Sequence, residues 1–106
     1  MQRQLRFTDE ADTQLKALAA DPAKSGLNKQ ILKTLGLLEL NPRHPGLQTH
    51  EYTSLQGTNG ERVWEAYAQN QTPGAYRVFF HYGPDEEGIG KKRIPVLTIV
   101  AITPHP

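Results

Sequence analysis

A strand-like alternation of hydrophobic and polar positions dominates the second half of the chain. Residues 63–68, 75–82 and 94–103 are rich in aromatic and β-branched side chains, and polar segments with turn residues separate them. Short runs of this composition are typical of strands. The connection at 70–74 has the length of a hairpin turn, and the one at 83–92 is longer. The pattern predicts three consecutive antiparallel strands.

The first half begins with one short alternating segment and then changes to helical spacing. Residues 4–8 alternate as a half-buried strand does. Thr8 then has the type and position of a helix N-cap, with carboxylates in the turn that follows. This predicts a strand and, directly after it, a helix that runs to about Ala20.

A second helix follows, and its start has two candidates. It begins at Asp21-Pro22 or, after a turn, at Ser25. It ends before Pro42, because the residue before a proline avoids the helical region. Its apolar stripe is formed by Leu27, Ile31, Leu35 and Leu38.

Residues 41–60 are polar and rich in proline and glycine, which predicts a loop with room for a short extended stretch. Loops of this length inside a compact domain are often functional. The resulting order, β-α-α-β-β-β, predicts an α+β protein in which two helices pack on one face of a small, antiparallel-dominated sheet. A chain of 106 residues fits one domain with one core, so residues 1–106 are taken as a single domain.

Alternation also assigns the two faces of the sheet. Successive side chains of a strand point to opposite faces, and we expect Trp64, Val78 and Phe80 beneath the helices. The last strand is apolar on both faces, which predicts an internal position, although Pro95 argues against an unbroken ladder at its start. An arginine within an aromatic strand is costly unless its face is hydrated or holds a partner, so the other face is a candidate anion-binding surface. That open face is expected to carry Glu65, Tyr67, Arg77, Phe79 and His81.

Composition narrows the classes of protein that remain. Without cysteine there is no disulfide or Cys-ligated zinc, and the four histidines lack the helical i, i+4 spacing of a metal site, so we expect neither metal nor cofactor. No apolar run approaches the roughly 20 residues of a membrane span, and the N-terminus has no signal-peptide pattern, which favours the cytoplasm. The net charge is +1, from 12 basic and 11 acidic residues, so any contact with nucleic acid must rest on a local patch.

Three short motifs connect this order of elements to a known family. They are Leu47-Gln48-Thr49-His50 ahead of the hairpin, Gly74-Ala75-Tyr76-Arg77-Val78-Phe79 in the middle strand, and the closing Ile102-Thr103-Pro104-His105. With the β-α-α-β-β-β order, they resemble the RelE/ParE superfamily of bacterial toxin–antitoxin toxins over nearly the whole chain. In that family, RelE-like members, those like YoeB and HigB included, cleave mRNA in the ribosomal A site without a metal and leave a 2′,3′-cyclic phosphate. ParE-type members inhibit DNA gyrase instead.

The resemblance implies roles for particular residues. Arg77 matches the family's strand arginine, which holds the scissile phosphate. His105 matches the position in the terminal strand where an arginine or histidine serves as general acid or phosphate ligand. YoeB-like members carry the base, a glutamate, just ahead of the hairpin, where Glu51 is the nearest carboxylate; His50 is the other candidate base.

Two features depart from the family pattern. RelE has paired lysines on the first hairpin strand, where this chain has Glu65 and Tyr67. The chain also stops at Pro106, before the tyrosine or extra helix that follows the last strand elsewhere. Both departures bear on whether the implied site is active.

The implied chemistry is cleavage of RNA by its own 2′-hydroxyl, which needs a base, a cation on the phosphate and an acid for the leaving oxygen. A guanidinium binds phosphate through paired hydrogen bonds, and imidazole exchanges protons near neutral pH, so Arg77 and His105 suit the last two roles. Each also has a plainer interpretation. Arg77 could be a surface arginine paired with Glu65 across the hairpin, and His105 an exposed terminal histidine.

Residues with candidate roles in RNA binding also have plainer interpretations. Tyr67 suits stacking on a base, and it suits equally a half-buried place in a strand. A basic run at the second hairpin could contact ribosomal RNA, or it could pair with the acidic residues 85–87 across the hairpin. The basic run consists of Lys91, Lys92 and Arg93.

The predicted function is the toxin of a type II toxin–antitoxin system that acts as a ribosome-dependent mRNA endoribonuclease. The implied partners are a cognate antitoxin protein, the ribosome and mRNA, and homodimerisation is left open. Two alternatives remain: a ParE-like gyrase inhibitor, and a catalytically silent module of this fold that only binds its antitoxin. The pairing of Arg77 with His105 favours the nuclease, and the near-neutral charge favours the silent module.

Overall fold

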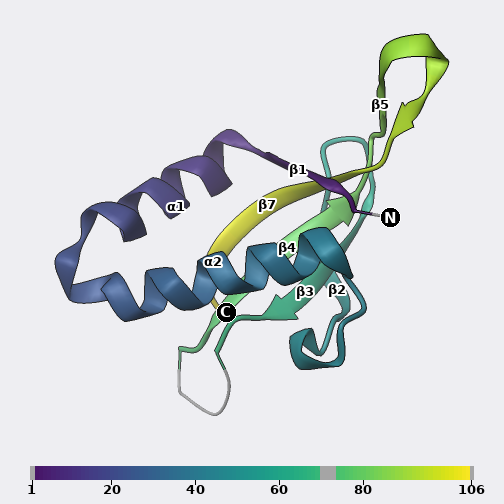
Figure 1. Cartoon of the computed structure of the whole chain (residues 1–106). Coiled ribbons are helices and arrows are strands. Elements are labelled where there is room, and N and C mark those ends of the chain that lie inside the picture. Colours follow the sequence, from purple (N-terminus) through teal and green to yellow (C-terminus); the bar gives the residue numbers. More distant parts are fainter. Residues whose placement is uncertain (1, 70–73, 106) are drawn as a thin grey trace.

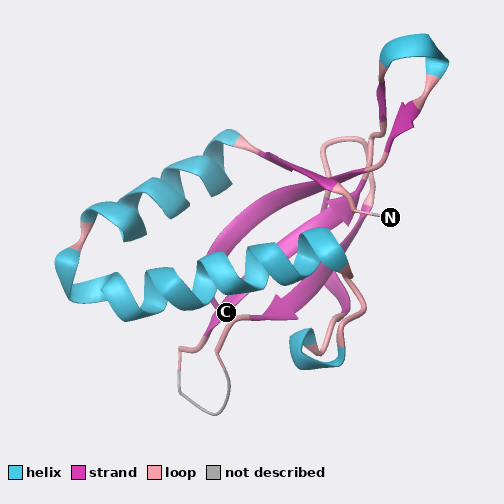
Figure 2. Cartoon of the chain, viewed as in Figure 1, coloured by secondary structure: helices cyan, strands magenta, loops and turns pink. Residues whose placement is uncertain are grey.

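The structure is a computed structural model in which residues 2–69 and 74–105 are described. Two helices and a mixed five-stranded sheet form its two layers (Figures 1 and 2). This confirms the predicted α+β class. Most of the predicted hairpin connection at 70–74 lies outside the described residues. None of the helices in these two ranges is long and apolar enough to cross a membrane.

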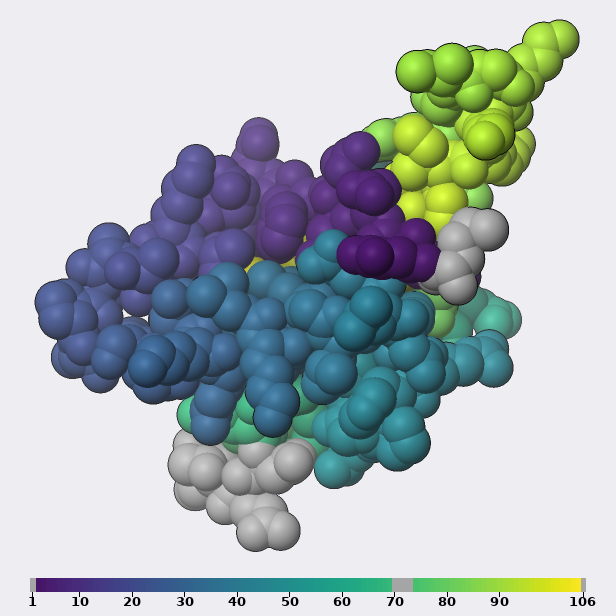
Figure 3. All heavy atoms as spheres, in the orientation of Figure 1, coloured from purple at the N-terminus to yellow at the C-terminus, as the bar shows by residue number. Residues whose placement is uncertain are grey.

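Both helices begin where local chemistry favours a start. The Thr8 side chain accepts a hydrogen bond from the Ala11 N–H at 3.2 Å and caps α1, Asp9–Ala20. Asp21 and Pro22 start a short 3₁₀ turn, η1 (Pro22–Lys24), and α2, Ser25–Leu40, follows it directly. The two candidate starts therefore belong to consecutive elements. The helices lie side by side over one face of the sheet, as Figures 1 and 3 show.

The sheet has the strand order β1-β7-β4-β3-β2, in which β1 runs parallel to β7 and the other pairs are antiparallel. β7 has a neighbour on each side, which confirms its predicted internal position, and Pro95 separates it from the strand before it. The bounds are β1 Gln4–Phe7, β2 His50–Gln56, β3 Arg62–Tyr67, β4 Tyr76–Tyr82 and β7 Val96–Pro104.

The interpretation of residues 41–60 as a loop was wrong for its second half. Only a 3₁₀ turn, η2 (Pro45–Leu47), precedes β2, which pairs with β3. β2 is an edge strand whose side chains are mostly exposed, so it needs no hydrophobic alternation and leaves no such signal in the sequence. A shift of register between Glu51 and Gln56 weakens the pattern further.

The two faces of the sheet carry the residues that alternation predicted, but the face away from the helices is not open. Val78 and Phe80 are buried against the helices, and half-buried Trp64 packs beside them. On the other face Phe79 is also buried, beneath the ring of Tyr52 from β2 at 4.9 Å between centroids. The polar residues of this face are buried as well, with exposed fractions of 1% for Glu65, 8% for Arg77 and 5% for His81.

A hairpin arm, β5 (Glu86–Glu87), η3 (Ile89–Lys91) and β6 (Arg93–Ile94), projects beyond the end of the sheet (Figures 1 and 3). Glu87 lies opposite Arg93, as the charge pattern predicted, but the ion pair of this segment is made elsewhere. Glu86 binds Arg6 of β1 at 2.6 Å, and hydrogen bonds from Arg6 lower the pKa of Glu86. Among the described residues the arm's lysines form no ion pair with residues 85–87.

Candidate functional site

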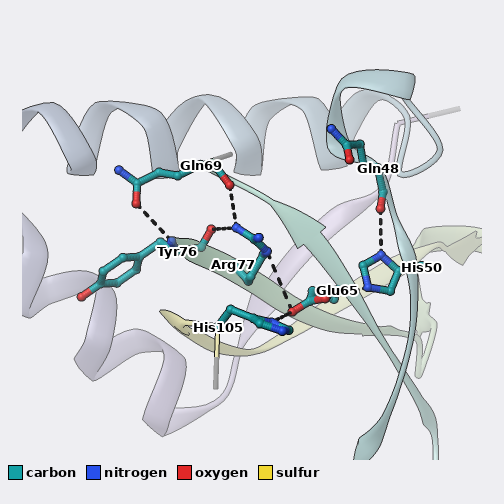
Figure 4. A network of polar contacts seen from close by, with 7 residues as sticks. All are labelled: Gln48, His50, Glu65, Gln69, Tyr76, Arg77 and His105. Carbon is teal, nitrogen blue, oxygen red and sulfur yellow. Dashed lines mark hydrogen bonds and ion pairs between the residues drawn. The ribbon is translucent and has the colours of Figure 1, made fainter. Parts of the chain in front are cut away.

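A buried carboxylate, Glu65, lies at the centre of a network of polar contacts (Figure 4). Its Oε1 is 2.7 Å from Nε2 of His50, and its Oε2 is 2.6 Å from Nδ1 of His105. Both oxygens of a group that is 1% exposed are thus satisfied by short, charge-assisted contacts. A carboxylate that binds two histidines in this way fixes the orientation of both rings.

The register of four strands brings the cluster together. His50 of β2 lies opposite Glu65 of β3, and Arg77 of β4 lies opposite Tyr67 of β3. His105 follows the end of β7, where its backbone N–H donates to the carbonyl oxygen of Ala75 at 2.9 Å. Arg77 and His105 meet on the face away from the helices, and Glu65 is the group between them.

Arg77 is held on several sides by the protein itself. Its Nη1 donates to the carbonyl oxygens of Gln69 at 2.6 Å and of Tyr76 at 3.2 Å. Its Cζ lies 3.7 Å from the centre of the Tyr67 ring, a cation–π contact. Its Nε is 4.0 Å from Oε2 of Glu65, too far for a hydrogen bond, and it is buried without a partner. No acceptor among the described residues is within hydrogen-bond distance of Nη2.

Hydrogen-bond partners distinguish the two histidines. Nδ1 of His50 is 3.0 Å from the carbonyl oxygen of Gln48, and its Nε2 contacts the carboxylate of Glu65. A carbonyl oxygen only accepts, so Nδ1 carries a proton, and one further proton lies between Nε2 and the carboxylate. Both nitrogens of His50 are therefore engaged. Among the described residues His105 uses only Nδ1, as donor to Glu65, and its Nε2 has no hydrogen-bond partner, on a side chain that is 46% exposed.

The structure does not bring the other predicted site residues into this cluster. Glu51 lies opposite Trp64, so its side chain is on the other face of β2 from His50, and it faces Arg62 at 3.7 Å. The predicted grouping of Glu51 with Arg77 and His105 was wrong for this reason. The basic run 91–93 lies on the arm, beyond Tyr82, and the five residue steps of β4 from Arg77 to Tyr82 alone span about 16 Å.

Sequence reasoning missed the central role of Glu65. It placed Glu65 on the same face as Arg77 and considered it only as the partner of a surface arginine. A lone carboxylate among aromatic and β-branched residues of a strand was the available signal, because such a residue is almost never buried without partners. The plainer interpretation of Arg77 is wrong in one respect, since the arginine is buried and not on the surface.

Comparison with known proteins gives a likeness of fold. No family model matches the sequence, and no curated protein matches it either. Among solved structures, the chain is similar to the YoeB dimer from Staphylococcus aureus, with 12% sequence identity, a TM-score of 0.57 and coverage of 100% of both chains. The chain is therefore an α+β protein whose fold is similar to that of YoeB.

Proposed function

We propose that this chain is the toxin of a type II toxin–antitoxin pair and that it cleaves mRNA in the ribosome without a metal ion. The observation that carries the proposal is the cluster of Arg77, Glu65 and His105, a guanidinium near an oriented imidazole whose Nε2 has no partner among the described residues. The likeness to YoeB, a RelE-family toxin, adds support at the level of the fold. The motifs of the strand arginine and the terminal histidine point the same way.

In the proposed reaction the 2′-oxygen of the RNA attacks the adjacent phosphorus, and the bond from phosphorus to the 5′-oxygen breaks. Nη2 of Arg77 binds the phosphate and stabilises its developing charge. Protonated His105 gives the proton on Nε2 to the leaving 5′-oxygen, while Glu65 holds the ring by its Nδ1–H and stabilises the imidazolium. The products are a 2′,3′-cyclic phosphate and a 5′-hydroxyl.

The base in this reaction is the least determined group. His50 was a candidate, but both its ring nitrogens are engaged, so it serves as a fixed hydrogen-bond partner of Glu65. Glu51 is on the other face of β2. The proton of the 2′-hydroxyl therefore passes to water or to a group that the ribosome supplies. The proposed partners are accordingly the ribosome, mRNA and an antitoxin, in the cytoplasm, with a homodimer suggested by the dimeric YoeB structure.

A second candidate is a silent module that binds its antitoxin and does no chemistry. The burial of Arg77 favours it, because the arginine is 8% exposed and is held by two carbonyl oxygens and an aromatic ring. If the chain is such a module, the cluster of Arg77, Glu65 and His105 has only the structural role of holding the strands together. The two candidates predict different results for the same expression experiment.

The experiment is induction of the chain in bacterial cells, followed by mapping of 5′ ends on ribosome-bound mRNA. We expect growth arrest and new 5′-hydroxyl ends within codons, both lost in His105→Ala. Arg62→Ala is the matched control, since Arg62 is an exposed strand arginine outside the cluster. Arrest with intact mRNA and inhibited gyrase would favour the ParE-like activity, and the absence of arrest would favour the silent module.

A further inference from the structure

A cavity of about 430 Å³ lies on the other side of β3 from the Glu65 cluster. Side chains alternate along a strand, so Trp64, which lines the cavity, points away from Glu65 beside it. The segment before β2 forms the rest of the wall. The residues that line the cavity include Arg43, His44, Gln48, Trp64 and Tyr82.

Two aromatic rings form a corner in this cavity. The rings of Trp64 and Tyr82 lie 6.3 Å apart between centroids with 79° between their planes, and both residues are only half-buried. A flat ring stacked on one of them presents its edge to the other, an arrangement favourable for aromatic groups. Arg3 lies over the Tyr82 ring at 5.0 Å, which adds positive charge nearby. The corner therefore suits a flat, electron-rich ring.

The polar groups of the cavity are donors and cations. Arg43 is exposed and forms no ion pair with any carboxylate among the described residues. Nδ1 of His44 accepts a hydrogen bond from the Gly46 N–H at 3.0 Å, so the neutral ring carries its proton on Nε2 and can donate it. Gln48 adds an amide that both donates and accepts. None of the described lining residues is acidic, which disfavours a cationic ligand.

We infer that this cavity binds a nucleotide, with the base on Trp64 and the phosphate on Arg43. Its volume lies within the range of small-molecule sites, and the site combines a stacking surface with a guanidinium, the two contacts that bind nucleotides without sequence preference. The inference goes beyond the proposed cleavage and does not rest on it. The ligand is either a free nucleotide or one nucleotide of a single strand of RNA, and the shared chemistry is an aromatic base with a phosphate.

Trp64 is the only tryptophan of the chain, so its fluorescence reports directly on this cavity. The experiment titrates the full chain, excited at the red edge of indole absorption, with each of the four ribonucleoside 5′-monophosphates. Adenosine and ribose 5-phosphate serve as half-ligands. We expect saturable quenching by the monophosphates and binding at least about tenfold weaker for either half-ligand, because each lacks one of the two contacts.

Arg43→Ala should weaken binding of the monophosphate about tenfold or more and leave the free nucleoside unaffected, since it removes only the phosphate contact. Lys29→Ala is the control, an exposed cation on α2 that does not line the cavity and should change nothing. A short single-stranded RNA distinguishes the sources. Binding at least tenfold tighter than the monophosphate identifies an RNA strand, and equal binding identifies a free nucleotide.

Two results would overturn the inference: no saturable change in Trp64 fluorescence with any monophosphate or with RNA, or equal affinities for the wild type and Arg43→Ala. Because Arg43 is exposed and precedes the 3₁₀ turn, its replacement should not disturb folding, and a circular dichroism spectrum checks this. A wild-type chain that binds nucleotides but does not cleave mRNA would count against the proposed function alone. A wild-type chain that cleaves mRNA but does not bind nucleotides in this cavity would count against this inference alone.

Discussion

Both faces of the sheet are buried, but the side chains buried on them differ in chemistry. Under the helices, aliphatic and aromatic side chains such as Phe80 and Ile99 form an apolar core, and burial of their surface stabilises the fold wherever they can pack. On the other face, Phe79 shares the interior with a buried carboxylate and a buried guanidinium. Charges can be buried only with partners in fixed positions. The first face depends on apolar burial and close packing, and the second also requires an accurate register of four strands.

The largest effect on stability is expected on the helix face. Phe80 is fully buried, so Phe80→Ala should lower the free energy of unfolding by about 3–5 kcal/mol, from lost burial and the cavity that remains. Trp64→Ala should cost less, because the indole is half-buried. Urea denaturation of both variants measures the difference. A larger loss for Trp64→Ala would show that the core is centred elsewhere than described.

Removing the central carboxylate is the next largest change. Glu65→Leu should cost about 3 kcal/mol, the lower end of the range for breaking a buried ion pair, since both histidines remain half exposed and can be hydrated. The double variant Glu65→Leu, Arg77→Met should be more stable than the sum of the single changes predicts, because no charge is left unpaired. Additive losses in the same urea series would contradict the coupling of Glu65 with Arg77.

A smaller effect is expected from the ring that covers Arg77. Tyr67→Leu should cost roughly 1 kcal/mol through the lost cation–π contact, whereas Tyr67→Phe keeps the ring and should cost little. Thermal melts of the two variants separate these contributions. An equal loss in Tyr67→Phe would mean that the hydroxyl, and not the ring, holds the arginine.

The smallest effect concerns the hairpin arm. Arg6 lowers the pKa of Glu86 below the ordinary 4.5, so the contact stabilises the folded state above about that pH and is lost as the pH falls through the lower folded value. The protection factors of the arm's amides in hydrogen exchange, which are corrected for the intrinsic exchange rate at each pH, should therefore fall on acidification below pH 4.5. Arg6→Gln should show at neutral pH the lower protection factors that the wild type shows in acid. Equal protection of the arm in the wild type and in Arg6→Gln would show that the contact between Arg6 and Glu86 does not hold the arm against β1.

Sequence patterns predicted the features of the fold that depend on neighbouring residues alone. The cap at Thr8, the stripe of the second helix and the alternation in β3 and β4 follow from spacing alone, and the structure confirms them. β2 was missed because an exposed edge strand needs no apolar period. The bonds of Glu65 to His50 and His105 join residues 15 and 40 positions apart, and they depend on the register of strands that no local pattern fixes.

The most direct test of the central claim is the rate at which purified protein cleaves mRNA on programmed ribosomes in a single turnover. The account predicts cleavage by the wild type and a loss of about 10²–10⁴-fold in His105→Ala, the usual contribution of a general acid. His50→Ala should lose less, because it has no free nitrogen and acts only by holding Glu65. Cleavage by His105→Ala at the rate of the wild type would contradict the account.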